Sequence, residues 1–370
     1  MDKIHKKNRI KISFAFIVLS ILSQVYADVD SNFHCYLLVG QSNMAGGCKE
    51  KVVGNECEPN DRIKVLAFRT CNQTSEACGV HFSRQADQWY TATPPYHNCN
   101  EGIGPADYFA RALLDSIRQD ITIGLIPCAL SGQSIKIFKK GSGKLTRYNC
   151  WVHEELCDQD RFVYDWMLER CRIAQETGVI KGILFHQGET DNGNGWWVDT
   201  TKEIFDNLKS DLGLGDIPIV VGELLQVPGA CCSDHNPLVN KLASEYPNCA
   251  LASSEGLAMR PGDQWNAHFS CDGVKVLGER YAEAFLGLAD LDHVPRLKNN
   301  VNKPSQSKRV ANSVMINSYG KDISIYSING KVVSNRHNNS SNRLNMKTSG
   351  VYIVKTRTNG NMSLVPIIDN

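Results

Sequence analysis

The sequence of 370 residues lacks the short motifs of several common hydrolases and metalloproteins. It contains no Cys-x-x-Cys pair, and the stretch HEEL that begins at His153 does not complete the HExxH zinc motif. The usual metal sites of proteins are therefore not indicated. No GxSxG pentapeptide is present, which argues against the nucleophile elbow of an α/β-hydrolase. After residue 27 no apolar run has the length of a membrane-spanning helix.

Residues 1–27 have the pattern of a secretory signal peptide. Basic side chains precede the apolar run 12–22, and the small-residue sequence VYA ends at Ala27. That run is too short to be a comfortable membrane span, and the pattern predicts cleavage after Ala27. The mature protein is therefore expected to be secreted or to lie at the cell surface.

All 14 cysteines lie between Cys35 and Cys271. An even number of cysteines in a chain that is expected to be exported predicts several disulfides. The sequence does not give their connectivity. We expect the adjacent Cys231 and Cys232 to bond to different partners rather than to each other.

Charge is distributed unevenly along the chain. The formal net charge is +1, but residues 301–370 carry ten Lys and Arg against only Asp322 and Asp369, and the signal segment is also basic. Residues 28–300 are therefore net acidic, at about −11 by difference. An acidic main domain argues against nucleic acid as a partner.

Apolar β-rich segments alternate with amphipathic helical segments through the main part of the chain, which we place at residues 28–295. This alternation predicts an α/β fold with a doubly wound parallel sheet covered on both faces. The expected strands are 33–39, 63–68, 121–127, 180–186 and 217–223, and the expected helices are 105–117, 162–177, 200–212 and 274–287.

The chain changes character after this region. Residues 296–312 are polar and without periodicity, as in a linker. Residues 313–370 alternate between apolar and polar side chains and contain two Asn-Gly turn signals, which predicts a small antiparallel β domain. Its segments IYSINGKVV and GVYIVK resemble the C-terminal sorting domains of exported bacterial enzymes, which implies contact with export machinery. A β-sandwich or carbohydrate-binding module is the alternative.

Three polar clusters follow expected strands of the main domain. GQSNMAGG begins at Gly40 after the first strand, SGQS covers 131–134 after the third, and HQGETD covers 186–191 at the end of the fourth. Ligands of open parallel sheets bind at the carboxyl ends of the strands. The three clusters therefore predict an active site at one edge of the sheet.

These clusters contain the groups that acyl transfer needs. Ser42 offers a nucleophilic hydroxyl, and the late loop histidine His268 offers a base, with His186 and His153 as rivals. The backbone amides of Ser42 and Gly132 and the side-chain amide of Gln187 are candidate donors to an oxyanion.

Together the blocks GQSNMAGG, SGQS, HQGETD and AHFS…LGERYAEAF resemble carbohydrate esterase family 6, within the sialate O-acetylesterase-like SGNH hydrolases. The resemblance covers about 33–287 and implies a flavodoxin-like α/β/α sandwich. It also implies Ser42 as nucleophile, His268 as base and Glu189 as orienting acid, with Gly132 and Gln187 at the oxyanion hole.

One block departs from the family pattern. The family often writes its histidine block as DxxH, but position 265 is tryptophan here. Asp263 lies five residues before His268 and needs an altered loop to replace that aspartate. We therefore favour Glu189 as the acid and keep Asp263 as the alternative.

The expected reaction is the two-step removal of an O-acetyl group from a polysaccharide, without metal or organic cofactor. Acetylated xylan is the first candidate substrate and O-acetylated sialic acid the second. A catalytically weak glycan-binding protein on the same fold is the remaining alternative. Trp196, Trp197 and Trp265 are candidates for a platform on which sugar rings stack.

Overall fold

The structure is a computed structural model that describes residues 29–50 and 55–288 and six strands between residues 313 and 369. The predicted signal segment 1–27 and the predicted linker 296–312 lie outside these described residues. The chain divides into two compact units, Met1–His293 and Val294–Asn370. Each unit is described by itself.

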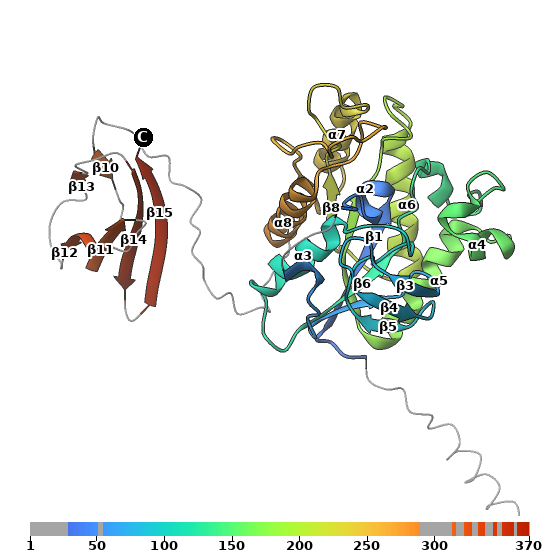
Figure 1. Ribbon diagram of the computed structural model, residues 1–370, viewed down its shortest axis with the longest axis horizontal. Coiled ribbons are helices and arrows are strands. Elements are labelled where there is room, and N and C mark those ends of the chain that lie inside the picture. The colour runs from blue at the N-terminus through green and yellow to red at the C-terminus, as the bar shows by residue number, and fades with distance from the viewer. Residues whose placement is uncertain are drawn as a thin grey trace, which may run out of the picture. The chain divides into compact units, whose positions relative to one another are not determined.

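The first unit is built around a seven-stranded sheet of order β5-β2-β6-β1-β7-β8-β9 (Figure 1). Every neighbouring pair is parallel except β5, which runs antiparallel to β2 at one edge. The parallel sheet is thus as predicted. Its strands are β1 (Phe33–Gly40), β2 (Ile63–Leu66), β5 (Trp89–Thr91), β6 (Thr122–Pro127), β7 (Val179–His186), β8 (Ile219–Gly222) and β9 (Cys249–Ala252).

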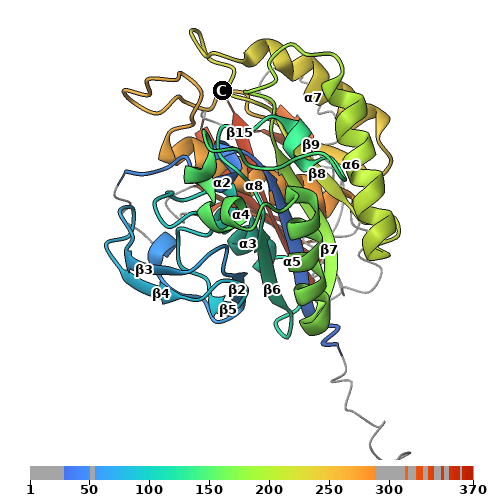
Figure 2. The same cartoon turned by 90° about the vertical axis from the view of Figure 1, so that its right-hand side faces the viewer.

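Helices cover both faces of this sheet (Figure 2). Side chains of α5 (Val163–Thr177), α6 (Trp197–Leu212) and α7 (Asn236–Glu245) pack in one apolar core. Side chains of α3 (Pro105–Leu114) and α8 (Cys271–Leu288) pack in a second core. Leu37 of β1 belongs to the first core and Leu38 to the second, because successive side chains of a strand point to opposite faces. The main domain is therefore a three-layer α/β fold.

Short elements form the loops around the sheet. They are α2 (Ser42–Ala45), α4 (Glu154–Asp158), the hairpin strands β3 (Cys71–Thr74) and β4 (His81–Arg84), and the 3₁₀ turns η1 (Asn55–Cys57), η2 (Ile135–Phe138), η3 (Cys150–Val152) and η4 (Ser233–His235). Sequence periodicity did not predict them, nor β5, β9 and α7. Most are shorter than five residues, too short for a periodic pattern to develop.

The described strands of the second unit all pair antiparallel. One sheet has the order β12-β11-β14-β15, and β10 pairs with β13. The two predicted Asn-Gly sequences fall between β11 and β12 and between β14 and β15. The strands are β10 (Ser313–Met315), β11 (Asp322–Ser327), β12 (Val332–Arg336), β13 (Arg343–Asn345), β14 (Gly350–Thr358) and β15 (Asn361–Asp369).

The prediction of several disulfides is confirmed in the described residues. The pairs are Cys48–Cys271, Cys57–Cys78, Cys71–Cys99, Cys150–Cys157 and Cys231–Cys232. The last pair corrects the expectation that these two neighbours bond elsewhere. The other four cysteines of the described chain are free: Cys35, Cys128 and Cys171 are buried, and Cys249 lies on β9.

None of the helices in the described ranges combines the length and apolar character that crossing a membrane requires.

Candidate active site

The end of β1 places Ser42 beside the end of β7. Gly40 has a φ of +145°, and a Cβ at this position would lie 1.9 Å from the carbonyl oxygen of His186. Only glycine permits this approach of the two strands. The amide of Gln41 then donates to the same His186 oxygen at 3.0 Å, and the short helix α2 starts at Ser42. The hydroxyl is thereby held at the carboxyl edge of the sheet, where the sequence predicted it.

A continuous chain of hydrogen bonds runs from Ser42 to a carboxylate. The Oγ of Ser42 lies 2.9 Å from Nε2 of His268. Nδ1 of the same ring lies 2.9 Å from Oδ1 of Asp263. A proton on Nδ1, donated to Asp263, leaves Nε2 free to accept from the serine hydroxyl. This is the arrangement in which an imidazole can act as a general base on a serine.

The loop between Asp263 and His268 takes the altered form that its length requires. Asn266 has a φ of +51°, a left-handed conformation that asparagine tolerates better than most residues. The turn brings the amides of Ala267 and His268 onto Oδ2 of Asp263, at 2.8 and 2.9 Å. Nη2 of Arg260 donates to Oδ1 at 2.6 Å.

The charge state of Asp263 follows from these contacts. Burial by itself raises the pKa of this carboxyl, but the hydrogen bonds from the backbone and ring of His268 and from the amide of Ala267 outweigh burial. The net effect holds the pKa of Asp263 well below its usual range. The carboxylate is therefore ionised at neutral pH and can stabilise an imidazolium.

Glu189 makes no hydrogen bond to His268. Its Oε1 accepts a hydrogen bond from Nδ2 of Asn43 at 2.6 Å, and its Oε2 is buried with no partner among the described residues. This corrects the expectation that Glu189 orients the histidine. The loop 263–268 brings the alternative acid, Asp263, onto Nδ1 instead. The single proton that Nδ1 can carry is then donated to Asp263.

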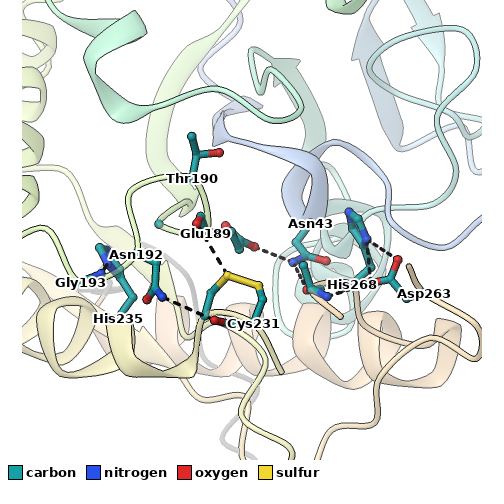
Figure 3. Close-up of a disulfide and its surroundings, with 12 residues drawn as sticks. Asn43, Glu189, Thr190, Asn192, Gly193, Cys231, His235, Asp263 and His268 are labelled. Atoms are coloured by element: carbon teal, nitrogen blue, oxygen red, sulfur yellow. Dashed lines mark hydrogen bonds and ion pairs between the residues drawn. A yellow bond between two sulfur atoms is a disulfide. The ribbon is translucent and has the colours of Figure 1, made fainter. Parts of the chain in front are cut away.

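Asn43 joins the serine segment to the histidine loop. Its Nδ2 donates to the carbonyl oxygen of Ala267 at 2.9 Å, and its Oδ1 accepts from the amide of Phe269 at 3.4 Å. It therefore holds the backbone on both sides of His268. Figure 3 shows Asn43 between Glu189 and His268. Sequence reasoning did not single out Asn43, although it lies in the block GQSNM.

Gln187 has a supporting position rather than one in the cavity. Its Nε2 donates to the carbonyl of Gln133 at 3.1 Å and to Asp191 at 2.8 Å, and its Oε1 accepts from the indole of Trp197. Both amide protons are therefore used, which corrects the expectation that Gln187 donates to an oxyanion. With Asp191, which accepts from the amide of Ile135, it fixes the loop after β6.

Gly132 reaches the site as predicted. It lines the same cavity as Ser42 and has a φ of +70°, which favours glycine. Its amide donates to no described residue. It is thus available to a bound group, as is the amide of Ser42.

The cavity at this edge has a volume of about 690 Å³ and is lined by Ser42, Gly132, Glu189 and His268 among others. Two largely exposed tryptophans, Trp265 at 64% and Trp151 at 58%, also line it. Trp151 comes from η3 and was not predicted, because no motif marks it.

The other two tryptophans of the expected platform lie elsewhere. Trp197 is fully buried in the core beneath α6. Trp196 lies outside the lining of the cavity, with the Nζ of Lys136 3.9 Å from its ring centroid. The expectation of three stacking residues is corrected, since α6 begins at Trp197 and turns its ring inward.

The rival histidines are both buried. His153 accepts from the amide of Leu156 at 3.2 Å as the cap of α4, and His186 lies 3.2 Å from the hydroxyl of Tyr281. Burial lowers the pKa of His186 to about 3. Neither histidine lines the cavity.

Comparison with known proteins identifies the chain. The family described as carbohydrate esterase, sialic acid-specific acetylesterase matches residues 32–287. The chain belongs to this family. The resemblance to sialate O-acetylesterase-like carbohydrate esterases seen in the sequence is thus confirmed, without the assignment to family 6.

Individual relatives of this esterase agree with the family. A probable carbohydrate esterase from Arabidopsis thaliana is 26% identical over 277 residues, which cover 68% of this chain and 89% of the relative. The crystal structure of an Arabidopsis thaliana protein matches with a TM-score of 0.52 at 24% identity, covering 69% of this chain and 98% of that one. The structure of NanS matches with a TM-score of 0.51 at 20% identity, covering 70% and 98%. These two structures show the same fold.

In the described part of this esterase, no three His, Cys, Asp or Glu side chains are grouped so that they could hold a metal ion.

Glu189 gives this esterase a pH-dependent stability. Burial raises the pKa of its carboxyl to about 7, so the folded protein holds this proton more tightly than the unfolded chain does. The resulting stabilisation is full below the ordinary pKa of about 4.5 and is lost as the pH rises through 7. Relative to Glu189→Gln, wild type should lose about 3 kcal/mol of unfolding free energy between about pH 4.5 and pH 8. Urea unfolding of both proteins across this range measures it, and a difference that does not change with pH contradicts it.

Proposed function

We propose that the protein is a secreted serine O-acetylesterase that removes acetyl groups from a polysaccharide, with acetylxylan as the substrate. The observation that carries the proposal is the hydrogen-bonded chain Ser42–His268–Asp263, which opens into a cavity flanked by exposed tryptophans. Glu189 is not part of this chain.

In the proposed first step, Oγ of Ser42 attacks the carbonyl carbon of the acetyl ester while Nε2 of His268 takes its proton. The imidazolium is stabilised by ionised Asp263. The tetrahedral intermediate collapses, the bond from carbon to the sugar oxygen breaks, and His268 returns the proton to that oxygen. Water then attacks the acetyl-serine by the same route, which releases acetate and restores Ser42.

The backbone amides of Ser42 and Gly132 are the proposed donors to the oxyanion. Both belong to residues that line the cavity, and neither amide has a partner among the described residues. Removing one such donor typically costs about 3 kcal/mol of transition-state stabilisation. Since Gln187 is committed to other acceptors, these two amides carry this role in the proposal.

The charges of the cavity support a neutral sugar. Arg260 is bonded to Asp263 and to the carbonyl of Gly47, and Lys49 lies 3.9 Å from Glu101. Both cations of the lining thus have an oxygen of the protein nearby, which makes them less available to the carboxylate of a sialic acid. Trp151 and Trp265 offer aromatic faces on which pyranose rings can pack.

Two alternatives differ in their support. A sialate O-acetylesterase is favoured by the description of the family itself. A weakly catalytic glycan-binding protein was suggested by the missing DxxH aspartate. The contact between Asp263 and His268 argues against that alternative.

Secretion and the role of the second unit are further parts of the proposal. The five disulfides of the described residues support an oxidising compartment. We propose that the antiparallel strands of Val294–Asn370 serve either export and surface sorting or glycan binding.

Acetate release tests the proposed substrate. Purified protein is incubated with acetylated xylan and, separately, with O-acetylated sialosides, and acetate is quantified over time. We expect kcat/KM for the xylan ester to exceed that for the sialoside at least tenfold. The reverse order assigns the enzyme to sialosides, and the absence of acetate from both substrates refutes the proposed reaction.

A further inference from the structure

The disulfide Cys231–Cys232 lies in the wall of the catalytic cavity. Both cysteines line the same space as Ser42 and His268. Figure 3 shows the disulfide next to Glu189, with Asn43 and His268 farther to the right. In the described residues it is the one disulfide with both cysteines in this lining.

A bond between adjacent residues contributes little as a crosslink. Disulfides stabilise a fold mainly by closing a loop of the unfolded chain, and the effect grows with loop length. Cys48–Cys271 joins positions 223 residues apart, whereas Cys231 and Cys232 are separated by one. The position of the pair in the cavity therefore points to a role other than stabilising the fold as a crosslink.

Hydrogen bonds to the backbone hold the pair in place. The amide of Cys231 donates to the carbonyl of Asn266 at 3.0 Å, and the amide of His235 donates to the carbonyl of Cys232 at 3.1 Å. Sγ of Cys232 lies 3.7 Å from the carbonyl oxygen of Glu189. The sulfurs are thus fixed between the loop after β7 and the loop that carries His268.

The exposed part of the pair is chemically distinct from the rest of the lining. Cys232 is buried, but Cys231 is exposed and shares the lining with Trp265. A disulfide has no proton to donate, and its sulfurs are large, polarisable atoms that pack well against apolar groups. The ring C–H groups of a sugar present such apolar surface, while its hydroxyls need polar partners.

We propose that the Cys231–Cys232 disulfide is a specificity-determining contact surface for the sugar ring that carries the acetyl group. The inference rests on the proposed esterase function and names a part of its substrate site. The rigid sulfur pair selects for a sugar face close to the ester, and an acetyl ester without a sugar lacks that face.

The double variant Cys231→Ala/Cys232→Ala tests this contact without leaving a free thiol. Activity is measured with an acetylated xylo-oligosaccharide and with p-nitrophenyl acetate. We expect the ratio of kcat/KM for the sugar ester to that for p-nitrophenyl acetate to fall about tenfold, through KM, as for the loss of one apolar pocket contact. Trp265→Ala should shift the ratio in the same direction, and Trp196→Ala, which lies outside the cavity, should leave it unchanged.

Two results would overturn the proposal. An unchanged ratio means that the sugar does not touch the pair. An equal loss of kcat on both esters means that the pair only supports the histidine loop through Asn266. If wild type hydrolyses neither ester, the esterase proposal itself fails, and binding of the deacetylated xylo-oligosaccharide to both proteins still tests the contact.

A second measurement needs no cysteine variant. A dithiol reductant is added to Ser42→Ala with and without xylo-oligosaccharide, and reduction of each disulfide is followed by mass spectrometry. We expect the sugar to slow reduction of Cys231–Cys232 severalfold and to leave Cys57–Cys78, outside the cavity lining, unaffected. Equal reduction rates at Cys231–Cys232 with and without a bound sugar contradict the proposal.

Discussion

Asp263→Asn is expected to lower kcat for p-nitrophenyl acetate about ten-thousandfold at neutral pH. The asparagine amide can present its nitrogen to Nδ1 of His268, which then carries its proton on Nε2 and cannot accept from Ser42. In serine hydrolases a wrong histidine tautomer alone has an effect of this size. KM should change only a few-fold, because Asp263 does not line the cavity.

Glu189→Gln is the matched control for this experiment. Both substitutions replace a buried carboxylate near His268 with an amide of similar size. The side-chain oxygen of the introduced glutamine still accepts the hydrogen bond from Asn43, so the backbone around His268 stays in place. We expect kcat to fall less than tenfold.

The opposite pattern would assign the role of orienting acid to Glu189. A severe loss in Glu189→Gln with a mild loss in Asp263→Asn means that the loop 263–268 rearranges when substrate binds. Since Asp263 also accepts hydrogen bonds from Arg260, Ala267 and the amide of His268, unfolding of each variant is followed in parallel. A folded, inactive Asp263→Asn protein is the expected result.

The sequence was sufficient to predict the frame of the site. Continuous apolar strands predicted a parallel sheet, and a parallel sheet brings the segments after β1, β6 and β7 to one edge. Ser42, Gly132 and Glu189 all reach the cavity for this reason. The sequence does not show which side chains of these segments line the cavity and which hold its walls in place. Gln187 and Asp191 belong to the conspicuous block HQGETD but bond to the loop backbone.

The choice between Glu189 and Asp263 as the proposed orienting acid could not be made from the sequence, because it depends on one backbone conformation. The spacing of Asp263 and His268 differs from the family block, and counting residues does not show where the extra chain goes. The left-handed Asn266 shortens the path, so that Asp263 reaches both the ring and the backbone of His268. The pairing of Cys231 with Cys232 could not be predicted for a similar reason, because the folded chain decides which cysteines come close together.

Ser42→Ala should have the largest effect of any single substitution. Loss of the nucleophile in a serine hydrolase lowers kcat about a millionfold, and what remains comes from binding and oxyanion stabilisation. We expect acetate release to fall below detection while the unfolding temperature stays within a few degrees of wild type. The stability should change little because the substitution removes only one hydrogen bond, between Ser42 and His268, and Ser42 is not part of the apolar core.

Ser131→Ala is the matched control, because its hydroxyl lines the same cavity. It donates to Oε1 of Glu101 at 2.6 Å and has no histidine as partner, so activity should fall less than tenfold. A fluorophosphonate probe then identifies the nucleophile directly: a bond from Oγ to phosphorus forms, fluoride leaves, and the hydroxyl proton passes to His268. Peptide mass spectrometry should find the adduct on Ser42 in wild type and in Ser131→Ala, and no adduct in Ser42→Ala. An adduct on Ser131 or Thr190, with activity retained in Ser42→Ala, would assign the chemistry to another hydroxyl of the cavity.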